Sequence, residues 1–280
     1  MTILETVRPS AGGPREASAR RFLLCRPTHF AVDYRINPWM QPSLGADPAV
    51  AVAQWDEVVR TYTRLGHRLE QVTPAPGLPD LVFSANAGLV IGDKALVSRF
   101  RHPERTGEEA IFLDWFLDHG FDAVQASVCN EGEGDYLVTG RGILAGSGFR
   151  TDPRAHAEVA SFFGRTVVPL TLVDPRFYHL DTALAVLDPE TIAYFPEVFA
   201  PDSRDLLADL FPDAILATEA DAVAFGLNAC SDGRHVVLAA GAVGLADQLT
   251  TRGFEPMLVD TSELQKAGGS VKCCTLELER

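Results

Sequence analysis

The chain repeats one pattern of apolar and polar positions five times. Each unit begins with apolar residues at helical spacing, ends at a glycine or proline, and continues into a short β-rich run. The pattern predicts five amphipathic helices, at residues 48–65, 105–119, 152–163, 202–211 and 241–252. They are expected to end at Gly66, Gly120, Gly164, Pro212 and Gly253. Thr106 and Glu109 match a capping box at the start of the second helix.

Each predicted helix leads into a short strand. These strands are expected at residues 68–72, 122–126, 166–172, 214–217 and 255–259. After most of them, two apolar runs flank a tight turn, which is typical of a β-hairpin. The hairpins are expected at residues 88–99, 136–145, 183–195 and 227–239. Helix, strand and hairpin therefore form one repeated module.

Five modules of this size cannot each enclose a core. We therefore expect them to close around a common axis in a radial α/β fold, with an ordinary doubly wound sheet as the alternative. No change of composition marks a domain boundary, so residues 20–280 are predicted to form a single domain. Residues 1–19 are polar and lack the continuous apolar stretch of a secretion signal, so we expect a disordered tail.

Composition and charge narrow the class of protein. With 46% hydrophobic residues and a mean hydropathy of +0.05, the chain has ample material for a large core, and its apolar runs are too short for a membrane span. The net charge of −14 argues against nucleic acid or an anionic membrane as the main partner. Five cysteines without a C-x-x-C pair argue against a disulfide framework or structural zinc and favour the reducing cytoplasm.

Several polar residues occupy comparable positions in successive modules. In a radial fold the equivalent point of each module faces the axis, so these side chains are expected to share one central cleft. They are Asn86, Glu131, Asp135, His179, Asn228 and Cys273. A thiol, an imidazole and a carboxylate together are the components of nucleophilic catalysis, in which histidine moves protons and the acid orients it.

The thiol and the imidazole each have a structural alternative. Cys273 and the adjacent Cys274 lie in an apolar stretch, where cysteine is more often an inert part of the core. The glycines at 268–269 favour function, because they let the backbone approach a ligand closely. His179 stands among aromatic residues and is equally compatible with a structural role.

The acidic residues Glu131, Glu133 and Asp135 alternate with glycine, so on an extended segment all three would point to one side. A solvated acidic loop is the alternative, but the apolar residues 136–138 that follow disfavour it. The remaining histidines show no ligand spacing, and we therefore assign neither a metal nor another cofactor.

Four motifs together resemble the guanidino-group-modifying enzymes of the pentein superfamily. They are FSANAG at 83–88, EGEGD at 131–135, YHLDT at 178–182 and GGSVKC at 268–273. The superfamily includes dimethylarginine dimethylaminohydrolases, arginine deiminases, amidinotransferases and arginine dihydrolases. The resemblance spans residues 21–278 in collinear order and implies a five-bladed, pseudo-symmetric α/β propeller, which agrees with the five modules.

The resemblance also implies roles for individual residues. Cys273 matches the nucleophile, His179 the general acid and base, and Glu131 the acid that partners the histidine. This chain has one residue more than the shorter family pattern EGGD, so Glu133 stays an alternative for that acid. The implied substrate-binding residues are Asp80, Asp135, Asn86 and Asn37, together with Arg99 and Arg150 for the α-carboxylate of the substrate.

One departure bears on the reaction. Where dimethylargininases and deiminases carry an aspartate, this chain has Asn86, and with the segment at 33–40 it looks most like the arginine dihydrolases. The implied reaction hydrolyses arginine to ornithine, carbon dioxide and two ammonias through a covalent S-alkylthiouronium. The alternatives are a dimethylargininase, an amidinotransferase and a non-catalytic pentein. The expected partner is a small guanidino compound, and a homo-oligomer stays open.

Overall fold

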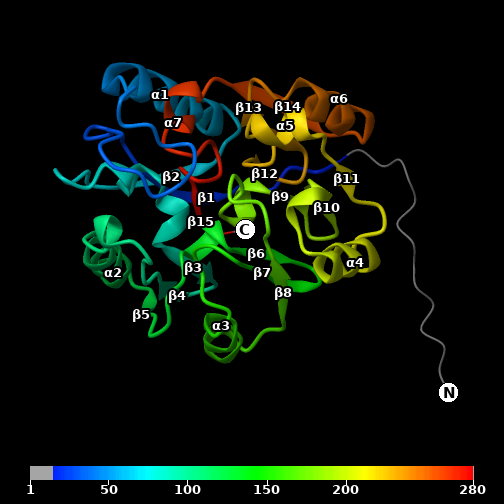
Figure 1. Ribbon diagram of the computed structural model, residues 1–280, viewed down its shortest axis with the longest axis horizontal. Coiled ribbons are helices and arrows are strands. Elements are labelled where there is room, and N and C mark those ends of the chain that lie inside the picture. The colour runs from blue at the N-terminus through cyan, green and yellow to red at the C-terminus, as the bar shows by residue number, and fades with distance from the viewer. Residues whose placement is uncertain (1–14, 280) are drawn as a thin grey trace.

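The computed structural model describes residues 15–279 of the chain. Within them, fifteen strands form five sheets of three strands each, which surround a central axis with the long helices outside (Figure 1). In four sheets the first strand in chain order lies innermost, and in the sheet that contains both ends of the described chain the last strand does. Innermost strands of different sheets contact one another. The radial arrangement predicted from the repeated modules is confirmed, and the doubly wound sheet is excluded.

Four sheets, or blades, follow the predicted module. An antiparallel hairpin is followed by a helix and by a strand parallel to the second hairpin strand. The first blade contains β3 (Gly88–Ile91), β4 (Lys94–Val97), α2 (Glu108–Asp118) and β5 (Asp122–Gln125); the second contains β6 (Tyr136–Thr139), β7 (Gly142–Ser147), α3 (Ala155–Phe163) and β8 (Val167–Thr171). The third contains β9 (Leu184–Asp188), β10 (Thr191–Tyr194), α4 (Pro201–Leu210) and β11 (Ile215–Leu216); the fourth contains β12 (Cys230–Ser231), β13 (His235–Ala239), α6 (Val243–Thr251) and β14 (Glu255–Val259). Short helices α5 (Glu219–Val223) and α7 (Ser262–Gln265) precede β12 and follow β14.

The fifth blade is built from both ends of the described chain. Its central strand β1 (Arg21–Cys25) pairs in parallel with β2 (Arg68–Val72), which follows α1 (Pro48–Arg64). On its other edge β1 pairs antiparallel with β15 (Leu276–Glu279), with Leu23 opposite Leu276. This pairing closes the ring, because strands more than 250 residues apart in the sequence complete one sheet.

The helix starts show where local sequence rules were insufficient. Asp47 caps α1 as a helix start requires, accepting hydrogen bonds from the Ala49 and Val50 amides. The predicted capping box of the second helix is wrong: Thr106 donates to the Pro103 carbonyl, and Glu109 accepts from the Phe100 amide. A turn of 3-10 helix, η3 (Pro103–Arg105), occupies this place, and α2 begins three residues later than expected.

Other sequence expectations concern the ends of the chain, membranes and cysteines. Residues 1–14 of the predicted tail lie outside the described residues, whereas Arg15 forms an ion pair with Asp188 and stacks on Phe254. No helix within residues 15–279 is long and apolar enough to cross a membrane. All five cysteines are free.

We expect the packing of β15 against the rest of the ring to stabilise the protein as much as packing inside the other blades does. Leu276 is fully buried, so Leu276→Ala should lower the free energy of unfolding by about 2–5 kcal/mol, as a buried leucine elsewhere would. Chemical denaturation followed by circular dichroism measures this change. Glu279→Ala on the same strand is the control, because Glu279 is exposed. An effect of Leu276→Ala no larger than that of the control would show that the ring is held closed without β15.

Candidate active site

The candidate residues precede the innermost strands of the blades. Short 3-10 turns lead into three of these strands: η2 (Ser84–Ala87) into β3, η4 (Gly132–Gly134) into β6 and η5 (Leu180–Thr182) towards β9. The innermost strands begin at the same end of the ring, so the side chains next to these turns meet on the axis. Asn86, Glu131, Asp135, His179, Asn228 and Cys273 are all at most 2% exposed.

A buried ion pair orients the imidazole. His179 Nε2 lies 2.8 Å from Glu131 Oε2, and Arg150 Nη1 donates to the same oxygen at 2.6 Å. Burial alone would raise the pKa of Glu131, but Arg150 and His179 outweigh burial and hold that pKa well below its usual value. Because an ionised carboxylate only accepts hydrogen bonds, Nε2 of His179 carries the proton of this contact. Nδ1, which is buried without a partner among the described residues, is left to exchange protons.

The structure also separates the two glutamates that the sequence left open. Glu133 points away from His179: its Oε2 accepts from Lys272 Nζ at 2.6 Å and from the Glu277 amide at 3.0 Å. Glu131, and not Glu133, is therefore the partner of His179.

Of the two adjacent cysteines, Cys273 contacts the polar cluster. Its Sγ donates to Asp181 Oδ2 at 3.2 Å and accepts from Asn228 Nδ2 at 3.1 Å. Asn228 Oδ1 also accepts from the Cys273 amide at 3.0 Å. Both cysteines belong to the same apolar cluster of the core. The contacts of the Cys273 thiol with Asp181 and Asn228 are what distinguish it from Cys274. Burial and the neighbouring Asp181 raise the pKa of the Cys273 thiol well above its usual value, so the thiol is protonated at neutral pH.

Two carboxylate oxygens near the axis are buried without a hydrogen-bond partner among residues 15–279. They are Asp181 Oδ1 and Asp80 Oδ1, and the other oxygen of Asp80 accepts from the Tyr34 hydroxyl at 2.9 Å. Burial raises the pKa of Asp181 to about 7 and also raises that of Asp80. Unpaired buried carboxylate oxygens are costly, and the N–H donors of a cation would satisfy them. The cluster is therefore suited to a guanidinium group.

Asn86 is held in one orientation. Its Oδ1 accepts from Arg105 Nη1 at 2.7 Å, and its Nδ2 donates to the Glu131 carbonyl at 3.1 Å. A Cβ at Gly134 would collide with Asn86 Nδ2 and lie 3.1 Å from His179 Nδ1. The glycine at 134 thus allows the amide nitrogen and the free imidazole nitrogen to approach the same point.

The other predicted substrate-binding residues lie in different environments. Asp135 is buried with both oxygens engaged, by the Thr151 hydroxyl at 2.6 Å and the Leu180 amide at 3.1 Å. Burial raises the pKa of Asp135 to about 6, although His179 and Thr151 oppose the shift. Arg150 is buried against Glu131, whereas Arg99 is exposed and donates to a backbone carbonyl at 2.7 Å. The structure therefore does not bring the two arginine side chains into one environment.

Residues 34–40 cover the cluster. Besides the bond from Tyr34 to Asp80, the Ile36 carbonyl accepts from Arg150 Nη2 at 3.1 Å, and Asn37 donates to the Ala267 carbonyl at 2.9 Å. Trp39 donates through its indole nitrogen to the Arg176 carbonyl at 2.7 Å. These contacts place residues 34–40 against the buried side chains of the cluster.

Sequence reasoning missed two members of the cluster. Asp181 lies two residues after His179 in the YHLDT motif, and this spacing could have indicated that it faces the same site. Arg105 lies outside every recognised motif, and only its contact with Asn86 reveals it. Among the described residues, no group of three or more His, Cys, Asp and Glu side chains has the geometry of a metal site.

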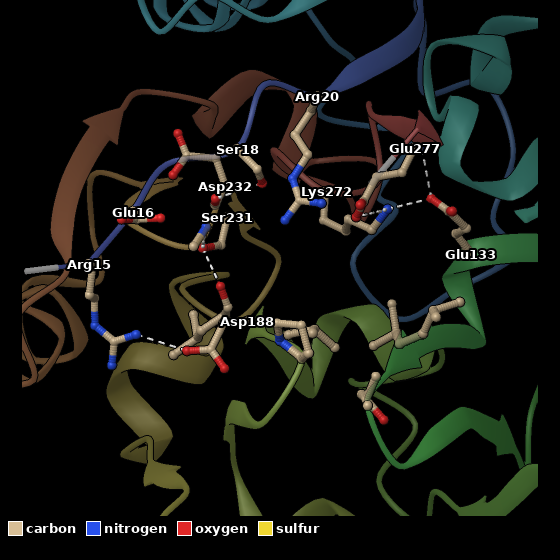
Figure 2. A pocket seen from close by; sticks show the side chains of 18 residues that line it. Arg15, Glu16, Ser18, Arg20, Glu133, Asp188, Ser231, Asp232, Lys272 and Glu277 are labelled. Carbon is tan, nitrogen blue, oxygen red and sulfur yellow. Dashed lines mark hydrogen bonds and ion pairs between the residues drawn. The ribbon is translucent and has the colours of Figure 1, made fainter. Parts of the chain in front are cut away.

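A separate cavity of about 550 Å³ lies at the opposite end of the same strands (Figure 2). Its lining includes the hairpin turns at Gly140, Pro189 and Gly233, whereas the candidate catalytic residues precede the first strands of the hairpins. The buried Glu133–Lys272 ion pair borders this cavity (Figure 2). The cavity is therefore distinct from the Cys273 cluster.

Comparisons with known proteins agree with this geometry. No family model matches the chain. It is 54% identical over 264 residues to N(G),N(G)-dimethylarginine dimethylaminohydrolase of Mycobacterium tuberculosis, covering 94% of this chain and 87% of the relative. It is 38% identical to the bifunctional arginine dihydrolase/ornithine cyclodeaminase ArgZ of Synechocystis, covering 92% of this chain but 37% of that longer protein. The crystal structure of the ArgZ N-terminal domain, a cysteine-to-serine variant bound to substrate, superposes with a TM-score of 0.90 at 37% identity, covering 93% of this chain and 98% of that domain.

The contact between Cys273 and Asp181 predicts a measurable change in thiol reactivity. Asp181→Asn removes the negative charge that raises the thiol pKa, so iodoacetamide should alkylate Cys273 about tenfold faster at pH 8 for each unit by which the pKa falls. Peptide mapping by mass spectrometry distinguishes Cys273 from the less buried Cys129. Asp152→Asn, at a surface ion pair, is the control. Unchanged alkylation of Cys273 would contradict the electrostatic role of Asp181.

Proposed function

The chain belongs to the family of dimethylarginine dimethylaminohydrolases and arginine dihydrolases, and we propose that within this family it is an arginine dihydrolase. It is a hydrolase that acts on guanidino C–N bonds of a small-molecule substrate. In our proposal it converts arginine, with two waters, to ornithine, carbon dioxide and two ammonias. The observation that carries this choice is Asn86, whose amide is held with its NH2 group beside His179.

The first hydrolysis begins with formation of the thiolate. Asp181 raises the pKa of the Cys273 thiol, so a guanidinium placed against Asp181 and Asp80 offsets their charge and favours ionisation. His179 takes the thiol proton, and the thiolate attacks the guanidinium carbon. The C–N bond to the departing nitrogen then breaks as His179 returns the proton and ammonia leaves. A covalent S-alkylthiouronium remains on Cys273.

In the second half of the first hydrolysis, the same imidazole first acts as a base. His179 Nδ1 removes a proton from water, which attacks the thiouronium carbon, and the C–S bond breaks to give citrulline. Throughout, the ionised Glu131 fixes the orientation of the imidazole, while Arg150 balances the charge of Glu131.

A second hydrolysis requires activation of a neutral ureido group. The Asn86 amide donates a hydrogen bond to the ureido oxygen, whereas an ionised aspartate would only accept. Cys273 attacks again, the second ammonia leaves, and water releases a carbamate that loses carbon dioxide to give ornithine. A neutral donor at position 86 therefore favours a dihydrolase.

A dimethylarginine dimethylaminohydrolase is the second candidate. The observation in its favour is the 54% identity to the mycobacterial protein of that name. This enzyme would use the same thiol chemistry on methylated arginine and stop at citrulline. The products formed from arginine and from asymmetric dimethylarginine separate the two candidates.

We predict that excess enzyme converts arginine to ornithine and two ammonias, measured by mass spectrometry and an ammonia assay. Asn86→Asp should make citrulline accumulate. One aspartate oxygen would still accept from Arg105, but the other would face the Glu131 carbonyl and place negative charge opposite the ureido oxygen. Asn130→Asp, a buried asparagine outside this contact, is the control. Wild-type enzyme that stops at citrulline, or that releases dimethylamine while leaving arginine untouched, would contradict the dihydrolase assignment.

We further propose that Arg99 binds the substrate α-carboxylate. The resemblance gives the same role to Arg150, but the Arg150 side chain is paired with the buried Glu131. Arg99→Ala should raise the KM for arginine by about 10- to 150-fold, which corresponds to losing a charge-assisted contact of about 1.5–3 kcal/mol. Agmatine, which lacks the carboxylate, should be a poor substrate of the wild type and insensitive to this substitution. Steady-state kinetics test both statements, with Arg101→Ala on the exposed neighbouring residue as control. Equal turnover of agmatine and arginine by the wild type would argue against a carboxylate-binding arginine.

A further inference from the structure

The cavity of about 550 Å³ at the hairpin-turn end of the ring, which we call the turn-end cavity, holds a basic side chain without a partner. Arg20 directly precedes β1 and lines this cavity, and Figure 2 shows its guanidinium directed inwards. Within residues 15–279 the side chain of Arg20 forms no ion pair, and its Nε atom is buried without a hydrogen-bond partner. An unpaired donor of a charged group is costly to bury, so a ligand that accepts hydrogen bonds is stabilised here.

The backbone of Arg20 is fixed on both sides. Its amide donates to His67 Nδ1 at 3.2 Å, and its carbonyl accepts from the Arg68 amide at 2.8 Å. The segment before it is attached as well, because the amide and the hydroxyl of Ser18 donate to the Asp232 carbonyl at 2.9 and 3.1 Å. The guanidinium therefore extends into the turn-end cavity from a fixed point, as in a site formed before its ligand binds.

The other basic side chains that line the cavity are already paired within the protein. Arg15 Nη1 lies 2.8 Å from Asp188 Oδ2. Lys272 Nζ lies 2.6 Å from Glu133 Oε2. In all, five acidic and three basic side chains line the cavity, so a doubly charged anion such as phosphate would be repelled. A single carboxylate instead matches the guanidinium of Arg20, with which it can form two parallel hydrogen bonds.

One wall of the turn-end cavity is apolar and comes from the second and third blades. It consists of Leu137 and Val138 of β6, Val186 and Leu187 of β9, and Pro189 in the turn after β9. An aliphatic group placed against this wall is stabilised by the apolar surface that both sides bury. The volume of the cavity lies in the range usual for small-molecule sites. These features fit a small ligand that has an aliphatic body and one carboxylate.

We propose that the turn-end cavity binds a small aliphatic monocarboxylate, whose carboxylate pairs with Arg20 while its body packs against β6 and β9. An ammonium group on the same molecule suits the acidic lining, so aliphatic amino acids belong to this class. Lys272 lines the turn-end cavity, whereas the adjacent Cys273 contacts Asp181 in the candidate active site. The ligand therefore binds apart from the reacting substrate, and the inference does not rest on the proposed dihydrolase function.

Calorimetric titration of the whole chain with isocaproate and with leucine tests this site. Both molecules have an aliphatic body and a carboxylate, and leucine adds an ammonium group. Arg20→Gln should weaken the binding of both about 10- to 150-fold, as expected when a charge-assisted contact is lost. Arg20→Lys, which keeps the charge but loses the planar fork, should weaken binding by less. Arg234→Gln is the control, because Arg234 is exposed and lies outside the lining of the cavity.

Two further titrations define the ligand. Isopentylamine, which lacks the carboxylate, and inorganic phosphate should each bind about tenfold or more weakly than isocaproate. Tighter binding of leucine than of isocaproate would assign the site to amino acids, and the reverse order would assign it to simple acids.

The proposal is wrong if neither acid binds the wild type, or if Arg20→Gln weakens binding no more than Arg234→Gln does. The second result would also identify a ligand held elsewhere, including at the Cys273 cluster. Circular dichroism establishes that the variants are folded. Should Arg20→Gln prove unfolded, Arg20→Lys decides the question: weaker binding of isocaproate than in the wild type supports the site, and unchanged binding overturns it.

Discussion

The pairing of β1 with β15 is the constraint on which both the ring and the site depend. It is the contact that joins the two ends of the described chain, and it turns a row of four blades into a closed ring of five. Cys273 lies three residues before β15, so the same pairing that completes the fold places the thiol beside Asp181 and Asn228 from the third and fourth blades. The thiol therefore reaches its partners only when the ring is closed.

The buried charges on the axis divide into two groups. Among the described residues, each buried glutamate near the site has a cationic partner within the protein: Glu131 with Arg150, Glu108 with Arg105, and Glu133 with Lys272. The buried aspartates Asp80, Asp135 and Asp181 form no such ion pair in residues 15–279, and burial raises the pKa of each, as it does that of Glu108. Because neutralising a buried carboxylate is favourable, Asp80 and Asp181, each with one oxygen that has no hydrogen-bond partner among the described residues, are suited to an external cation. The glutamates instead bind cationic side chains of the protein itself.

The sequence predicted the features that repeat in each module and those that depend on neighbouring residues. Hydrophobic period, helix-ending glycines and tight turns recur within each module, so β2 and the strands of the first four blades were predicted to within a few residues. The strands β1 and β15, which close the ring, were not predicted, because no helix–strand–hairpin module contains them. The convergence of polar residues followed from their equivalent positions. The choice between Glu131 and Glu133 did not, because on an irregular turn two residues of spacing do not fix direction, and η4 turns Glu133 towards Lys272 instead. The place of Arg105 beside the site was not predicted either, since it comes from a contact with Asn86, nineteen residues away.

The two hydrolyses of the proposed reaction make opposite electrostatic demands on one site. In the first, the substrate is a cation, and its charge offsets Asp181 and so favours the Cys273 thiolate. Citrulline is neutral, so in the second hydrolysis that help is lost and the thiol pKa rises again. Burial raises the pKa of Asp181 to about 7, so near neutral pH part of its carboxylate is protonated and the rest keeps the charge that disfavours the thiolate. What the neutral ureido group then requires is a hydrogen-bond donor that does not depend on substrate charge, and the Asn86 amide provides one at every stage.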